Sequence, residues 1–134
     1  MKLENNWLQK SLQSLEKKDW GTPEDSDSYL VRTVSSLRKV PLQQYSVEDV
    51  RIMIGQNEGL DYLVRVAVEI LRNDLFAEGD YYPGDLLNNV LNIKPSFWMR
   101  NQDLWRDINE LIKNRLDELT AHKIPIDKFY KVVT

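Results

Sequence analysis

The chain has 134 residues, of which 42% are hydrophobic and 29% are charged, and its net charge is -3. This length and composition predict one folded domain over residues 1–134 and exclude a disordered or membrane-spanning protein. The absence of cysteine excludes a disulfide scaffold and a thiolate metal site. Residues 1–6 lack the basic start and apolar run of a secretion signal, so we expect a cytoplasmic protein.

The first half of the chain contains several helical patterns. Apolar residues recur at helical spacing in residues 3–18, which predicts an amphipathic helix. Residues 19–28 are acidic and rich in turn formers, which predicts a loop. Residues 29–40 mix helical spacing with β-branched residues, and we favour a helix there. Ser46 is expected to cap a helix that begins at Val47.

The segment at residues 60–74 is apolar around most of its circumference, and its charges form one narrow stripe of alternating sign. This pattern predicts a helix at the centre of a bundle. Pro83 is suited to the first position of a further helix, with Asp80 or Tyr82 as its cap. Residues 104–119 predict a surface helix of about five turns, and residues 127–133 a short helix or tail. Together these patterns predict an all-α bundle of about five to six helices.

Two stretches, residues 19–30 and 74–85, carry negative charge without any Lys or Arg. They argue against nucleic-acid binding, which requires cations at the phosphates, and they suit a basic protein partner. Aromatic residues next to carboxylates are typical anchors of polar interfaces, and Trp20, Tyr29, Trp98 and Tyr130 are further candidates. The proposed contact residues are Asp19, Glu24, Asp25, Asp27, Glu78, Asp80, Tyr81, Tyr82 and Asp85.

Catalytic and cofactor motifs are sparse. The single histidine, His122, has no Ser or Asp partner at a recognised spacing, and the five glycines form no phosphate-binding loop. Asp80 and Asp85 lack the ligand spacing of a calcium-binding loop. We therefore predict no catalytic residue, cofactor or metal. Two alternatives stay open: a small helical hydrolase in which Glu78 shares acid and base roles with Asp80 or Asp85, and a general helical adaptor.

Between Leu37 and Trp98 the chain contains the motifs LRKVPL (37–42), IGQNEGLDYL (54–63), EGDYYPGDLL (78–87) and FW (97–98). This combination resembles a family of immunity proteins from bacterial contact-dependent growth inhibition (CDI) systems. The resemblance implies a small cytoplasmic protein that binds the toxic C-terminal domain of a cognate effector and neutralises it. Such toxins are often nucleases, and an acidic immunity protein would then occupy or flank the basic groove of the nuclease.

Overall fold

The computed structural model describes residues 2–132, and every regular element within them is helical. The elements are η1 (Trp7–Gln9), α1 (Leu12–Glu16), α2 (Tyr29–Leu37), η2 (Leu42–Gln44), α3 (Val47–Gly55), α4 (Leu60–Asn73), α5 (Asp85–Leu91), α6 (Pro95–Arg100), α7 (Gln102–Ile112), α8 (Leu116–Ala121) and α9 (Asp127–Tyr130). The all-α prediction is confirmed. The described helices outnumber the predicted five to six because two predicted helices are broken and because α6 and η2 were not predicted.

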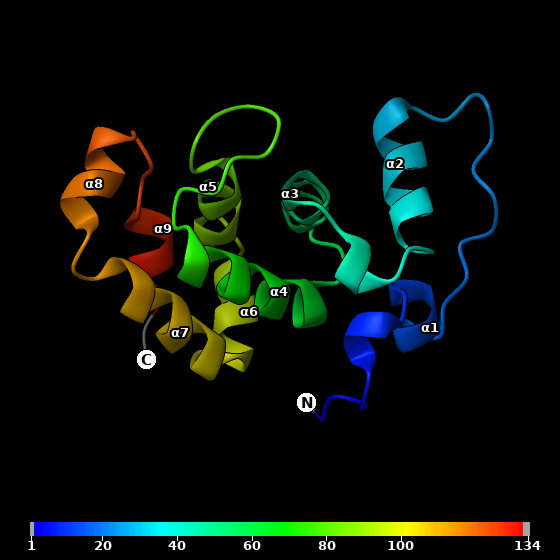
Figure 1. Cartoon of the computed structure of the whole chain (residues 1–134), viewed down its shortest axis with the longest axis horizontal. Coiled ribbons are helices and arrows are strands. Elements are labelled where there is room, and N and C mark those ends of the chain that lie inside the picture. The colour runs from blue at the N-terminus through cyan, green and yellow to red at the C-terminus, as the bar shows by residue number, and fades with distance from the viewer. Residues whose placement is uncertain (1, 133–134) are drawn as a thin grey trace.

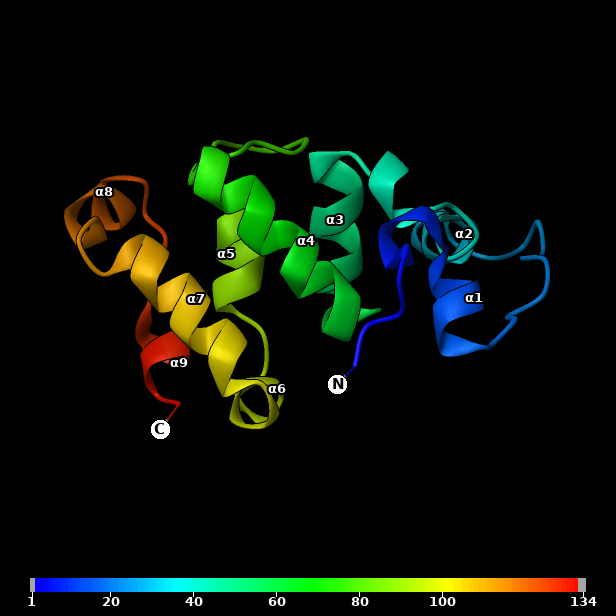
Figure 2. The same ribbon diagram turned by 60° about the horizontal axis from the view of Figure 1, so that its bottom comes forward.

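Helix α4 lies at the centre of the molecule, as its apolar circumference predicts. It packs against α3, α5 and α7 (Figure 1, Figure 2). Leu63, Val64 and Ala67 of α4 have no exposed surface. In the charged stripe of α4, Arg72 pairs with Glu69. No helix among residues 2–132 combines the length and the hydrophobicity that crossing a bilayer requires.

The N-terminal ends of α2 and α3 are fixed by serine side chains. The Ser46 hydroxyl accepts a hydrogen bond from the backbone N–H of Asp49, and the Asp49 carboxylate accepts one from the N–H of Ser46. The Ser28 hydroxyl caps α2 without a reciprocal bond, accepting from the N–H of Val31 at 3.1 Å. Such caps satisfy N–H groups that have no partner within the helix. The predicted helices at 29–40 and 47–54 are therefore confirmed, although α2 ends at Leu37.

Three further predicted helices differ in extent from the observed ones. The helix predicted for residues 3–18 is divided, because Ser11 is extended and caps the short α1. The helix predicted for 104–119 is interrupted between Ile112 and Leu116, so that α7 and α8 are separate elements. The helix predicted to open at Pro83 begins at Asp85, and its N-cap is Gly84 with φ +92°, so neither Asp80 nor Tyr82 caps it. In the last predicted segment α9 is present, and residue 133 lies outside the described part.

An aromatic cluster closes the C-terminal end of the core. Trp98 is fully buried, and its ring meets that of Phe129 edge-on at 5.4 Å. Trp105 stacks on Phe129 and donates its indole N–H to the carbonyl oxygen of that residue at 3.0 Å. Trp98 is therefore a core residue and not the interface anchor that the sequence suggested. Tyr130 is partly exposed, but its hydroxyl donates to Asn109 at the edge of this cluster.

Candidate functional site

Residues 76–85, here called the acidic turn, connect α4 to α5 and rise at the upper edge of the molecule (Figure 1). An isolated antiparallel bridge joins Glu78 to Pro83, and the N–H of Gly84 donates to the carbonyl of Phe76 at 3.0 Å. The carboxylate of Asp85 folds back into the turn, where it accepts from the N–H of Gly79 at 2.7 Å and from that of Tyr81 at 3.1 Å. Asp85 is only 2% exposed. Its carboxylate therefore holds the turn closed and is not available at the surface.

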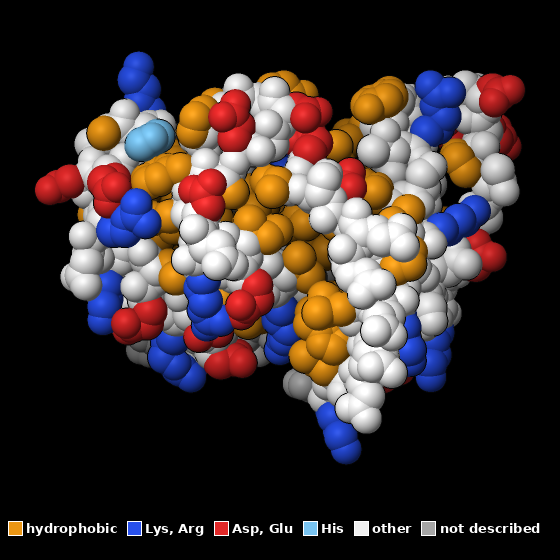
Figure 3. Space-filling view, viewed as in Figure 1, with side chains coloured by type: hydrophobic (Ala, Val, Ile, Leu, Met, Phe, Trp, Pro, Cys, Tyr) orange, Lys and Arg blue, Asp and Glu red, His pale blue; other side chains and the backbone are white. Residues whose placement is uncertain are grey.

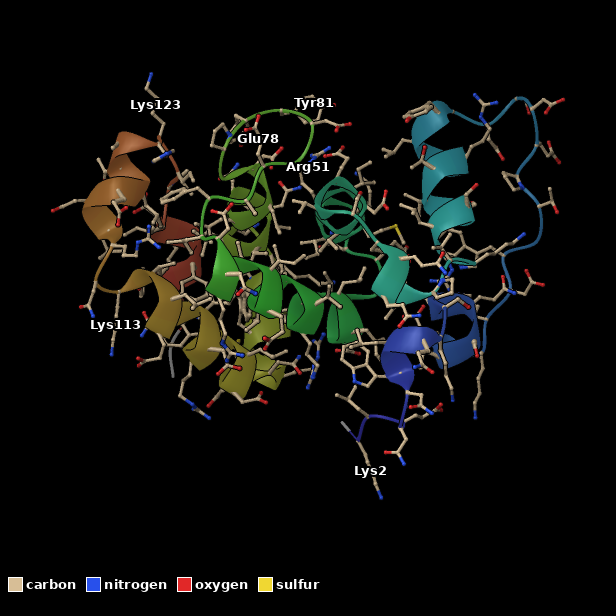
Figure 4. All side chains as sticks on the ribbon, viewed as in Figure 1. Lys2, Arg51, Glu78, Tyr81, Lys113 and Lys123 are labelled. Atoms are coloured by element: carbon tan, nitrogen blue, oxygen red, sulfur yellow. The ribbon has the colours of Figure 1, made fainter. Side chains whose placement is uncertain are left out.

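Two side chains of α3, Glu48 and Arg51, contact the acidic turn. Arg51 donates two hydrogen bonds of 2.6 Å to the carboxylate of Glu48, and Glu48 accepts a third from the N–H of Asp80 at 2.8 Å. The hydrogen bonds from Arg51 are the main reason that the pKa of Glu48 is lowered below its ordinary value. The guanidinium also lies 4.5 Å from the ring centre of Tyr81, which is within the range of a cation–π interaction. Both residues are labelled in Figure 4.

The close packing of Glu48 and Asp85 against the acidic turn explains why a glycine occupies position 79. A Cβ atom there would lie 2.4 Å from a carboxylate oxygen of Glu48 and 3.0 Å from one of Asp85. Neither oxygen is free to move, because each accepts a backbone hydrogen bond from the turn. The acidic turn is thus a rigid structure, and its tip presents the exposed side chains of Glu78, Asp80, Tyr81 and Tyr82.

The tyrosines at the tip differ in how they are held. Tyr81 is 70% exposed and lies over Arg51, whereas Tyr82 is 41% exposed and its hydroxyl accepts a hydrogen bond from Asn88 at 2.9 Å. Both rings therefore have fixed positions at the surface. Ordered aromatic side chains lose little conformational entropy when a partner covers them.

The second acidic stretch, residues 19–28, is the loop that the sequence predicts, and here it is called the acidic loop. Asp19 accepts from the N–H of Gly21 at 2.7 Å, and Asp27 accepts from the N–H of Glu24 at 2.9 Å. These two acids shape the loop. The side chains of Glu24 and Asp25 are exposed and accept no backbone hydrogen bond among the described residues.

Helix α2 stands between the two acidic stretches. The acidic loop enters α2 at the upper edge, the same edge at which the acidic turn lies (Figure 1). Acidic side chains gather over both stretches in Figure 3, and the surface between them is hollowed. The first turn of α2 exposes three apolar side chains, since Tyr29, Leu30 and Val31 are 75%, 40% and 46% exposed. The sequence indicated Tyr29 alone; Leu30 and Val31 were missed because their spacing also fits a buried face.

The carboxylates of the acidic turn do not form a catalytic pocket. The cavity beside the turn, of about 350 Å³, is lined by Arg51, Gly55, Gln56, Tyr81 and Asn89 together with Leu30 and Ile52, and Glu78, Asp80 and Asp85 are not among its walls. Within residues 2–132, no group of three or more His, Cys, Asp or Glu side chains is arranged to hold a metal ion. The hydrolase alternative therefore gains no support from the geometry.

Comparison with known proteins identifies the family. A family model of CDI immunity proteins matches residues 14–108, which is more than half of the chain and includes both acidic stretches. Neither the comparison with curated proteins nor that with solved structures finds a significant match. The matched region extends beyond the motifs of residues 37–98 on both sides. The chain belongs to the family of CDI immunity proteins.

Proposed function

We propose that this immunity protein binds the toxic C-terminal domain of a cognate CDI effector in the cytoplasm and neutralises it as a non-enzymatic inhibitor. The observation that carries the proposal, beside the family, is the pair of acidic stretches at one edge of the molecule. Glu24 and Asp25 are exposed on the loop, and Glu78 and Asp80 on the turn. Asp19 and Asp27 support this surface by shaping the loop, and Asp85 by closing the turn.

We further propose that the toxin is a nuclease with a basic groove. A protein that binds nucleic acid must place Lys and Arg against the phosphates, and an inhibitor with exposed carboxylates on a hydrogen-bonded turn is complementary to such a groove. Tyr81 and Tyr82 provide amphipathic contact area beside these charges. The negative potential raises the rate of association more than it raises the final affinity.

The first experiment is co-expression with the toxin domain encoded immediately upstream of this chain. We expect the chain to protect the cells and to co-purify with the toxin domain. We also expect the purified toxin to degrade nucleic acid, and an equimolar amount of the chain to stop the degradation. Cells that die despite normal levels of the chain, with no complex recovered, would refute the proposal.

The contact surface is tested by the double charge reversal Glu78→Lys and Asp80→Lys. We expect the association rate with the toxin domain to fall by about tenfold or more at low salt, and its salt dependence to weaken. The control is Asp103→Lys with Asp117→Lys, two exposed acids on α7 and α8 that change the net charge equally. Stopped-flow kinetics at two salt concentrations measures both variants, and equal effects would remove the acidic turn from the contact surface.

A further inference from the structure

A small pocket lies against α2. Its volume is about 180 Å³, and its walls are Trp20, Leu30, Val31, Val34, Gln56 and Glu58. Sites for small-molecule ligands usually measure about 300–1,000 Å³, so this space suits one long side chain and not a metabolite. The walls from the acidic loop and α2 are apolar, and the residues from the turn between α3 and α4 are polar. We call it the α2 pocket.

The α2 pocket is built on a buried arginine. Arg38 is 2% exposed, and its guanidinium lies 4.6 Å from the ring centre of Trp20. Arg38 also donates to Glu16 at 2.6 Å and to the backbone carbonyl of Lys18 at 3.2 Å. These contacts fix the acidic loop where Trp20 forms the wall of the pocket. The Trp20 side of the pocket is therefore present before any partner binds.

Glu58 places a negative charge at one end of the α2 pocket. Arg38 contacts only the Oε2 atom of Glu58, at 3.4 Å, while its shorter contact goes to Glu16. The carboxylates of Glu16 and Glu58 thus share the Arg38 guanidinium. Lys18 is the other cation that lowers the pKa of Glu58. Burial is the main reason that the pKa of Glu58 is raised, and the charge of Glu16 raises it further, so the net shift is upward despite Arg38 and Lys18. A further cation at Glu58 would therefore be favourable.

We propose that the α2 pocket receives one Lys or Arg side chain of the cognate toxin, with its methylene stem against Trp20, Leu30 and Val31 and its cation at Glu58. This inference rests on the proposed function and adds the chemistry of one contact. Lys and Arg commonly bury their stems along apolar surface while the charged end keeps a polar partner. A purely apolar side chain would instead cover Glu58 without compensating its charge.

The surroundings of the α2 pocket agree with a basic occupant. Leu30 also lines the cavity beside Arg51 and Tyr81, so the pocket adjoins the acidic turn. Arg32, the cation on α2, lines a different cavity with Tyr29 on another side of the helix. A basic toxin segment that lies across the two acidic stretches would therefore pass directly over the pocket.

The test is a double-mutant cycle between this chain and the toxin domain encoded upstream. Glu58→Gln removes the charge, Leu30→Ala shortens one apolar wall, and Met99→Ala on α6 is the control, because Met99 is an exposed hydrophobic side chain outside the pocket. Each is combined with a Lys-to-Ala and Arg-to-Ala scan of the toxin. We expect Glu58→Gln to raise the Kd by about tenfold. One toxin cation should then lose most of its effect in the Glu58→Gln and Leu30→Ala backgrounds and keep it with Met99→Ala.

The outcomes separate this inference from the proposed function. Wild-type chain that binds the toxin with no toxin cation coupled to Glu58 or Leu30 overturns the pocket contact and leaves the proposed function standing. Weaker binding with Leu30→Ala alone shows an apolar occupant and also overturns the cation contact. Wild-type chain that fails to bind overturns both. Thermal unfolding of each variant verifies folding, and the Leu30→Ala cycle decides the question if Glu58→Gln is unstable.

Discussion

At the scale of single residues, Asp85 shows how a predicted contact residue serves the fold. The sequence groups Asp85 with the acids of the acidic turn, but its buried carboxylate accepts two backbone hydrogen bonds from that turn. Charge-assisted hydrogen bonds of this kind replace the water that the N–H groups of Gly79 and Tyr81 lose on folding. The residue thus affects the contact surface through the shape of the turn.

We predict that Asp85→Ala lowers the free energy of unfolding by about 2–4 kcal/mol, because it leaves two N–H groups without their acceptor. Asp25→Ala, on the exposed acidic loop, is the control and should change the stability by less than about 0.5 kcal/mol. Urea denaturation of the two variants measures the difference. Equal stabilities would show that the turn closes without the Asp85 carboxylate.

At the scale of elements, prediction succeeds for α3, where local side chains define the start of the helix. Ser46 and Asp49 bond each other's backbone, so the start of α3 is encoded within four residues. Prediction fails at the end of α7, where the sequence contains no helix breaker. Helical spacing of apolar residues continues from Ile112 to Leu116, and no Gly or Pro lies between them, yet the helix is interrupted there. In that interruption the Arg115 guanidinium lies 5.5 Å from the ring centre of Phe76.

The candidate site divides in the same way. The acidic loop and the acidic turn were predictable from charge alone, because no cation lies within either stretch. The α2 pocket was not, because it joins Trp20, the face of α2 and Glu58, which are far apart in the sequence. Its position depends on Arg38, whose burial no helical pattern indicates. The α2 pocket therefore becomes evident only in the folded structure.

The contact between α3 and the acidic turn predicts a dependence of stability on pH. Hydrogen bonds from Arg51 lower the pKa of Glu48 from its ordinary value of 4.5. An acid whose pKa is lowered by folding stabilises the protein fully above its unfolded pKa, and this contribution is lost as the pH falls through the lower, folded pKa. We therefore expect the contribution of Glu48 to be complete above about pH 5 and to disappear in the range below pH 4.5.

Glu48→Gln tests this linkage. The variant should be less stable than the wild type at pH 6, and the difference should shrink as the pH falls toward 3. Glu24→Gln changes the net charge equally and leaves the contact between Glu48 and Arg51 intact, so it is the matched control. Urea unfolding midpoints at pH 6, 4 and 3 give the comparison. A constant difference between Glu48→Gln and the wild type across these pH values would contradict the linkage.

At the scale of the whole molecule, the two acidic stretches depend on different anchors. The acidic turn is joined to α3 and α5, which pack on the central α4. The acidic loop is joined to the rest of the chain through Arg38, which contacts Glu16 before the loop, Trp20 within it and Glu58 beyond α3. One buried side chain therefore joins residues 16–20 to Glu58, which is remote from them in sequence.

We predict that Arg38→Met loosens the acidic loop before it unfolds the core. The variant loses its ion pairs, but both carboxylates are partly exposed, at 33% and 27%, and water can solvate them. The expected cost is therefore about 2–3 kcal/mol, below that of a fully buried pair. Lys17 and Lys18 are exposed at the start of the loop, so limited trypsin digestion should cut there several times faster than in the wild type.

Arg100→Met on α6 removes an exposed cation as the control and should leave both the stability and the cleavage rate unchanged. Because α3, α4 and α5 do not contain Arg38, association driven by the acidic turn should persist in the variant while the contribution of the α2 pocket is lost. Unchanged cleavage at Lys17 and Lys18 would show that the loop is held by contacts other than those of Arg38.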